Sequence, residues 1–215
     1  MLTINELLST ELDSRDENWE KNFLSQVLQA HVKVLAPEPR QGPDKWPYLM
    51  VETVQADAED AEPITAVLQW LAGRGIGLVL NPQKLAPDYV FTYGMIWNLR
   101  ERGAFLSPAP QSSAGPIAIR AGQEVLAGPP SEAYLPTYVR GVIKQFLMDQ
   151  GIFAPKALMV SFDKVNYDLC FSIESFKSPA SSEHAGIAEA LSWFLPAHYA
   201  VSMVSEKTIP GFSNF

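Results

Sequence analysis

The sequence predicts an α+β protein made of two similar halves, each with a helix, two strands, a second helix and a third strand. Apolar residues recur at helical spacing in some segments, and short apolar or alternating runs bounded by Gly and Pro separate them. The order of these segments is the same in residues 16–80 and 131–204. We therefore expect two mixed or antiparallel sheets, each with helices packed on one face.

The first half is expected to contain, in order, a helix from Asp16, strands over 31–36 and 48–54, a helix from Pro63 and a strand over 76–80. Asp16 is a good N-cap, because its carboxylate accepts from backbone N–H groups of the first turn. Proline suits a first helical turn, and the next helix is expected to end at Gly73 or Gly75. The polar residues 1–15 are expected to form a frayed or weakly docked end.

Two further elements are expected in the N-terminal half after the strand over 76–80. Residues 88–91 read as a short strand, and residues 92–101 as an amphipathic helix that Gly103 ends. The run Ser-Pro-Ala-Pro-Gln-Ser-Ser-Ala-Gly-Pro that follows is typical of a linker. We expect an N-terminal half over 1–108, a linker over 109–116 and a C-terminal half over 117–215.

The second half is expected to contain, in order, a hairpin of 117–120 with 124–127, a helix over 131–150, strands over 157–162 and 167–173, a helix over 181–195 and a strand over 199–204. The turn Asp163-Lys-Val-Asn is short, so the two middle strands should be an antiparallel hairpin. Gly151 and Pro196 are signals that end the helices before them.

Composition and charge exclude several classes of function. The formal net charge of the 215 residues is −8, and the 16 basic residues are scattered singly. Nucleic acid and anionic membranes are therefore not expected partners, because both need a concentrated basic face. The chain lacks a long apolar run and a recognisable signal peptide, and its single cysteine, Cys170, cannot form an internal disulfide. These features suit the cytoplasm.

Three alternating glycines, Gly73, Gly75 and Gly77, invite comparison with a nucleotide-binding loop. A dinucleotide fingerprint runs from strand to glycines to helix, with the phosphates at the helix N-terminus. Here the expected order is reversed, so phosphates would meet the negative end of a helix dipole. The glycines predict a helix end followed by close backbone packing, and no cofactor is expected.

No catalytic or metal-binding motif stands out in the sequence. The histidines lack the i, i+4 spacing of a zinc site, and no cysteine pair exists. Cys170 alternates with apolar residues of an expected strand, so it reads as a small core residue. One enzymatic arrangement stays open: a hydrolase or transferase site in a cleft between the halves, using His198 or His184 with Asp163 or Asp168.

The segment after the central strand of the first half is unusually aromatic. It contains Tyr89, Phe91, Tyr93, Met95 and Trp97. One helix face cannot bury all of them, so some are expected to form an exposed apolar patch that binds a partner. The alternative is that they form the contact between the two halves.

Several segments resemble the bacterial enhanced-serine-sensitivity (SseB-like) family. They are Phe23-Leu-Ser-Gln-Val-Leu-Gln-Ala-His-Val-Lys-Val34, Gly77-Leu-Val-Leu-Asn81-Pro82, Gly128-Pro-Pro before a long helix, and the near-terminal Pro210-Gly-Phe212. These are packing and turn motifs that together span most of the chain. The resemblance implies a small α+β protein with an accessory or regulatory role and carries over no site residues.

The sequence thus predicts a non-enzymatic cytoplasmic protein that binds another protein through residues 89–97 and can form a homodimer. The enzyme described above is the main alternative. A third hypothesis is a chaperone-like module that binds an amphipathic segment of a secreted protein.

Overall fold

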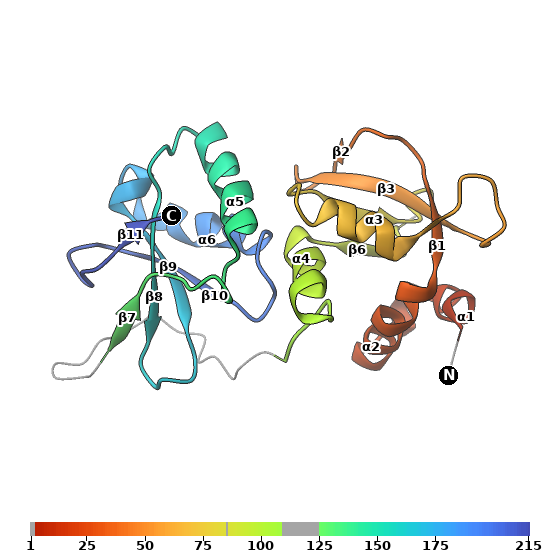
Figure 1. The fold of residues 1–215 in the computed structure, drawn as a ribbon, viewed down its shortest axis with the longest axis horizontal. Helices are drawn as coiled ribbons and strands as arrows, with labels where there is room; N and C mark the ends of the chain where they lie inside the picture. The colour runs from red at the N-terminus through yellow and green to blue at the C-terminus, as the bar shows by residue number, and fades with distance from the viewer. Residues whose placement is uncertain (1–2, 85, 109–124) are drawn as a thin grey trace. The chain divides into compact units, whose positions relative to one another are not determined.

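The computed structural model describes residues 3–84, 86–108 and 125–215, and it has an α+β architecture. The chain divides into two compact units, Met1–Phe105 and Leu106–Phe215 (Figure 1). The expected linker over 109–116 and the expected strand over 117–120 lie outside the described residues.

The N-terminal unit has a mixed sheet and four helices within its described residues. In chain order the elements are α1 (Ile4–Leu8), α2 (Glu17–Gln26), β1 (His31–Val34), β2 (Arg40–Gln41), β3 (Pro47–Val54), β4 (Glu62–Pro63), α3 (Ile64–Leu71), β5 (Gly77–Leu80), β6 (Tyr89–Phe91) and α4 (Tyr93–Arg102). The strand order is β4-β1-β3-β5-β6, with β2 paired to β3. β1 and β3 are antiparallel, β3 and β5 are parallel, and β6 runs antiparallel to β5.

The chain start is more ordered than the sequence suggests. Thr3 and Glu6 form a reciprocal capping box at the start of α1, in which each side chain accepts from the other's backbone N–H. Leu7 is 1% exposed within the core, and its carbonyl accepts a hydrogen bond from the Trp19 indole at 3.0 Å. The expectation of a frayed or weakly docked end is therefore wrong for α1, where a buried leucine and a capped first turn hold the helix on the core.

Alternation along the strands places the core of the N-terminal unit. Leu49 and Val51 of β3, and Leu78 and Leu80 of β5, share one cluster with apolar residues of all four helices. The helical members with least exposure include Phe23, Ile64 and Leu71. This face of the sheet is therefore the one that the helices cover.

The C-terminal unit has a second mixed sheet. Its elements are β7 (Leu126–Gly128), α5 (Thr137–Asp149), β8 (Lys156–Ser161), β9 (Asp168–Ser172), α6 (His184–Ser192), β10 (Ala200–Val204) and β11 (Ser213–Asn214). The strand order is β10-β9-β8-β11, with β7 paired to β8. β8 and β9 form the expected antiparallel hairpin, and β10 is parallel to β9.

Two helices of this unit are shorter than the sequence predicts. The expected helix over 181–195 is α-helical only over His184–Ser192, preceded by a 3-10 turn at Ser181–Glu183. The expected helix over 131–150 begins only at Thr137, with Pro136 as its N-cap. Proline disfavours helical backbone in the residue before it, so Leu135 ends a separate turn that the carbonyl of Ser131 closes.

The two units repeat one topology. In each, a helix is followed by an antiparallel pair of strands, a second helix and a strand parallel to the second member of the pair: β1, β3 and β5 in one unit, and β8, β9 and β10 in the other. The units differ at the outer side of the third strand, where β5 has β6 beside it and β10 ends its sheet.

The C-terminal segment covers one face of the second sheet. Ile209 packs with Leu158, Val160 and Cys170, and Phe212 lies against the same cluster. Gly211 between them has φ +102°, a conformation that favours glycine. The resemblance motif Pro210-Gly-Phe212 thus places an aromatic ring on the core.

Candidate functional site

Most of the predicted partner-binding residues are buried. Phe91, Tyr93 and Trp97 are 0% exposed and Met95 is 8% exposed. Phe91 and Met95 belong to the core cluster of the N-terminal unit, and the Tyr93 hydroxyl donates to the carbonyl of Ala72 at 2.7 Å. The expectation of an exposed patch at these four residues is wrong, because residues 93–98 of α4 are buried on every side of the helix.

Tyr89, the fifth predicted residue, is partly exposed and joins two elements of the same unit. Its hydroxyl donates to Glu20 Oε1 at 2.6 Å, and its ring centroid lies 4.9 Å from that of Phe23 and 4.7 Å from that of Phe91. Burial, together with the hydrogen bond to Glu20, raises the pKa of the Tyr89 phenol. Tyr89 therefore packs β6 against α2 through its ring and its hydroxyl hydrogen bond.

Three of the four residues of the enzymatic hypothesis, His184, His198 and Asp163, have local structural partners, while burial, followed by the charge of Asp163, raises the pKa of the fourth, Asp168. His184 Nε2 lies 3.2 Å from the carbonyl oxygen of Pro179, and the His198 ring meets the Tyr199 ring edge-on. Asp163 Oδ1 accepts from the backbone N–H groups of Val165 and Asn166 at 2.9 and 2.7 Å. These bonds from Asn166 and Val165 lower the pKa of Asp163 to about 2, so it closes the β8–β9 turn as a carboxylate.

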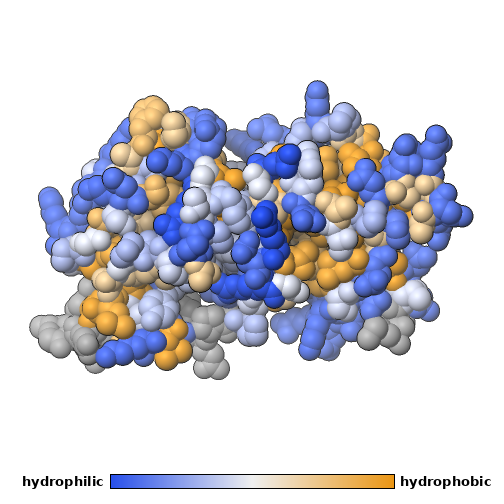
Figure 2. All heavy atoms as spheres, in the orientation of Figure 1, coloured by the Kyte–Doolittle hydropathy of each residue, from blue (hydrophilic) through white to orange (hydrophobic). Residues whose placement is uncertain are grey.

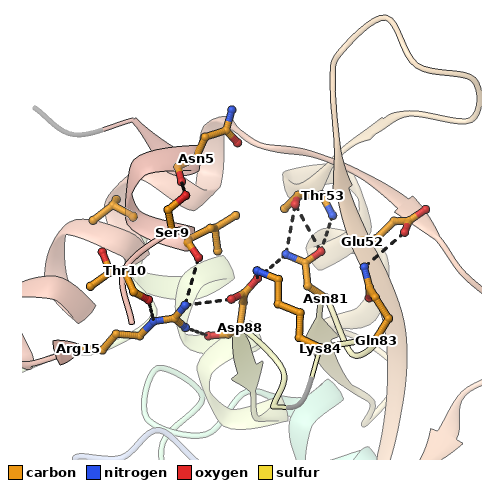
Figure 3. Close-up of polar contacts among 12 residues, drawn as sticks. Asn5, Ser9, Thr10, Arg15, Glu52, Thr53, Asn81, Gln83, Lys84 and Asp88 are labelled. Carbon is orange, nitrogen blue, oxygen red and sulfur yellow. Dashed lines mark hydrogen bonds and ion pairs between the residues drawn. The ribbon is translucent and has the colours of Figure 1, made fainter. Parts of the chain in front are cut away.

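A buried polar network lies beyond the end of β5, where the sequence reads Leu80-Asn-Pro (Figure 3). The Asp88 side chain is only 2% exposed, and three side chains donate to it. Arg15 reaches Oδ1 at 2.9 Å, while Asn81 and Lys84 reach Oδ2 at 2.7 and 2.5 Å. Burial raises the pKa of Asp88, but the hydrogen bonds from Lys84, Asn81 and Arg15 outweigh it and leave the pKa lowered.

Arg15 ties the N-terminal segment to this loop. Its guanidinium also donates to the carbonyls of Thr10, Leu8 and Asp88, so its N–H groups are directed into the protein. The sequence contained no signal for this pair, since Arg15 and Asp88 are far apart in the chain and neither belongs to a motif.

Asn81 orients the start of the same loop. Its φ is +54°, a left-handed conformation that asparagine tolerates better than most residues. Its side-chain oxygen accepts from the backbone N–H of Thr53 at 2.8 Å, and its amide donates to Asp88. The hydrogen bonds of this network thus connect β3 and the loop after β5 to the N-terminal segment.

Gly75 and Gly77 have the turn and packing roles that the sequence predicts, whereas a Cβ at Gly73 would meet nothing within 4 Å. α3 precedes them and β5 follows them, and Gly75 turns the chain with φ +68°. A Cβ at Gly77 would lie 2.6 Å from the Tyr48 ring and 2.7 Å from the carbonyl oxygen of Phe91, so only glycine fits.

A hollow of about 420 Å³ lies on the N-terminal unit between α3, α4 and the turn before β1, and we call it the α3–α4 groove. Leu28, Leu68, Ile96 and Leu99 form its apolar part, and the other lining residues are Thr65, Gln69, Arg100 and Gly103. In Figure 2, hydrophobic surface gathers over the part of this unit where Figure 1 draws α3. Sequence reasoning pointed to α4 but to different positions on it.

A second polar cluster ties the ends of β9 and β10 to the start of β8. Lys156 Nζ lies 2.9 Å from Glu206 Oε2, and Ser172 Oγ donates to Glu206 Oε1 at 2.6 Å. Glu174 accepts from Ser205 Oγ at 2.5 Å and from the Glu206 backbone N–H at 2.9 Å. The bond from Ser205, followed by that from Glu206, lowers the pKa of Glu174 to about 2.

The described part of the chain holds no group of three or more His, Cys, Asp or Glu residues placed to bind a metal ion. Cys170 is 0% exposed, and burial raises the pKa of its thiol to about 12, which disfavours the reactive thiolate. None of the helices among the described residues has the length and apolarity needed to cross a membrane.

Comparisons of the chain with protein-family models, with curated proteins and with solved structures found no match.

Proposed function

We propose that this chain is a non-enzymatic, cytoplasmic accessory or regulatory protein, and that its N-terminal unit binds an amphipathic helix of a partner protein in the α3–α4 groove. The observation that carries the proposal is the groove itself, which has an apolar floor and a polar rim. Ligand sites combine these two features, and helical peptides bind such grooves through residues spaced i, i+3, i+4 and i+7. The resemblance to the enhanced-serine-sensitivity family supports an accessory role.

The charge of the rim supports a helix with acidic flanks. Arg100 is the charged residue among those that line the groove. It lies 3.6 Å from the Glu101 carboxylate, and Arg102 in the same turn leaves the end of α4 with a formal charge of about +1. A carboxylate beside the apolar stripe of the partner would meet this local positive charge although the chain as a whole carries −8. The partner is therefore expected to place Glu or Asp, and not Lys, next to its apolar anchors.

A peptide measurement tests the groove directly. The probe is a labelled amphipathic helix of about 16 residues with Leu anchors and Glu flanks, and binding is followed by fluorescence anisotropy. Thr65→Trp fills the groove from its rim, while Ala66→Trp adds the same ring at the adjacent exposed position, which does not line the groove. We expect Thr65→Trp to weaken binding at least tenfold and Ala66→Trp to leave it unchanged.

The same peptide with Lys in place of Glu is the charge control. It should bind more weakly, and the difference should shrink as salt is added. Equal affinity for the two peptides, or equal loss in the two tryptophan variants, would contradict the proposed site. A photo-crosslinking residue at Gln69, compared with one at exposed Gln145 of α5, then identifies the natural partner in cells.

A further inference from the structure

The outer edge of β10 differs from the other strands that end or flank the two sheets. Among the described residues, β2, β4 and β11 have two residues each, and β6 and β7 have three. β4 also contains Glu62 and Pro63, residues that discourage further pairing. β10 has five residues, Ala-Val-Ser-Met-Val, without charge or proline. Among the described residues, β10 is thus the one strand at the end of a sheet that is long and also lacks the charged residues and prolines that discourage pairing with another strand.

The internal repeat shows what normally covers this position. β5, the counterpart of β10, is paired on its outer side with β6 in antiparallel register, Leu78 with Phe91 and Leu80 with Tyr89. After β10 the chain instead returns to β8, where Ser213 of β11 pairs with Ala157 at the opposite edge. The described residues of the C-terminal unit thus provide no strand equivalent to β6.

The hydrogen-bond pattern identifies the backbone groups left at the edge. The carbonyl of Val204 accepts from Ile173 N–H at 3.1 Å, so Val204 bonds toward the β9 side. Backbone groups of successive strand residues point to opposite sides. Ser202 and Ala200 therefore also bond toward β9, while the N–H and C=O groups of Val201 and Met203 point outward.

We propose that a second copy of this chain supplies the missing strand, with β10 of each protomer pairing antiparallel to β10 of the other about a two-fold axis at Ser202. Val201 of one copy would then exchange both backbone hydrogen bonds with Met203 of the other, and the reverse, so all the outward groups are satisfied. The apolar side chains of Val201 and Met203 would form cross-strand pairs. A second copy fits because an uncharged strand is complementary to itself, whereas the rest of the chain carries −8.

Disulfide trapping tests both the partner and the register. In this arrangement the two Ser202 residues form a non-hydrogen-bonded pair with Cα atoms about 4.5 Å apart, a distance that a disulfide spans. Ser202→Cys should therefore give a covalent dimer on mild oxidation. Because Ser202 pairs with Cys170 of β9, both cysteine variants also carry Cys170→Ala, so that a disulfide can join only the introduced cysteines. Ser213→Cys, in the edge strand β11, is the matched control and should stay largely monomeric.

Equilibrium association is measured by light scattering on the full chain over a range of concentrations. Val201→Pro removes an outward N–H without removing a bond to β9, so two of the four bridging hydrogen bonds are lost. We expect the dimer dissociation constant to rise roughly tenfold to a hundredfold, with an unchanged circular dichroism spectrum. If that variant fails to fold, Ser202→Lys places like charges opposite each other at the axis and should give salt-dependent dissociation.

A monomer at the highest soluble concentration overturns the proposal. So does equal crosslinking of the Ser202 and Ser213 variants, or a dimer that Val201→Pro and Ser202→Lys leave intact. Thr65→Trp in the α3–α4 groove should not change the dimer, so this proposal and the proposed function fail or succeed separately.

Discussion

Replacing Asp88 by alanine should destabilise the N-terminal unit far more than removing an exposed carboxylate. The Asp88 side chain is 2% exposed and that of Arg15 is 9% exposed, so the substitution leaves a buried guanidinium without its countercharge. Breaking a buried ion pair by removing one partner typically costs about 3–5 kcal/mol. Arg15 keeps its bonds to three backbone carbonyls, which places the expected loss near the lower end, at about 3 kcal/mol.

Two further substitutions separate charge from hydrogen bonding. Asp88→Asn keeps the shape and an acceptor but removes the charge, and charge-assisted hydrogen bonds are about twice as strong as neutral ones. We therefore expect it to lose roughly half as much stability as the alanine variant. Lys84→Ala, whose side chain is 47% exposed, should cost at most about 1 kcal/mol because water screens that pair.

The matched control is Asp60→Asn, which removes the charge of a 70% exposed carboxylate paired with Lys33 at 3.1 Å and keeps a residue that tolerates the left-handed φ of +62° at this position. Stability is measured by urea unfolding, with hydrogen exchange of peptides from β5 and β6 to follow the N-terminal unit by itself, because a chain of two units need not unfold in one step. If Asp88→Asn and Asp60→Asn shift the midpoint of this unit equally, the reasoning about the buried pair is refuted.

Two other predictions concern the loop after β5 and the acid sensitivity of the C-terminal unit. Asn81→Gly loses the side-chain bonds to Thr53 and Asp88, whereas Asn81→Ala also strains the left-handed backbone; the alanine variant should be less stable by about 1–2 kcal/mol in the same urea assay, and equal losses would contradict that account. The pKa of Glu174 is lowered from 4.5 to about 2, so at this residue the folded state binds fewer protons than the unfolded state between these values. The contribution of Glu174 to the stability of the C-terminal unit should therefore be constant above about pH 5 and be lost as the pH drops toward 2. Glu174→Gln should flatten this dependence in urea titrations at successive pH values and exposed Glu189→Gln should not, while identical pH profiles in both variants would rule out Glu174 as a source.

The burial of the aromatic segment, residues 89–97, shows that sequence patterns can predict a helix and still predict the wrong exposure for its side chains. The sequence predicted α4 well, because Thr92 is a good N-cap and Gly103 is a good C-cap with φ +72°. It predicted the wrong exposure for Phe91, Met95 and their neighbours, because periodicity describes one amphipathic face and α4 is buried on all sides over residues 93–98. The α3–α4 groove could not be predicted for a related reason: it forms from residues on three segments whose packing is non-local.

The sequence by itself determined the α+β class, the α-β-β-α-β order in both units, the β8–β9 hairpin and the packing role of the glycines before β5. These features depend on local signals, such as apolar spacing, caps, turn residues and the steric freedom of glycine. Only the tertiary structure decided that Arg15 meets Asp88, that β5 has β6 beside it while no described strand lies at the outer side of β10, and that the C-terminal segment covers Cys170. Contacts of this kind join residues far apart in the chain, and no local pattern specifies which of the many possible pairings satisfies every buried group at once.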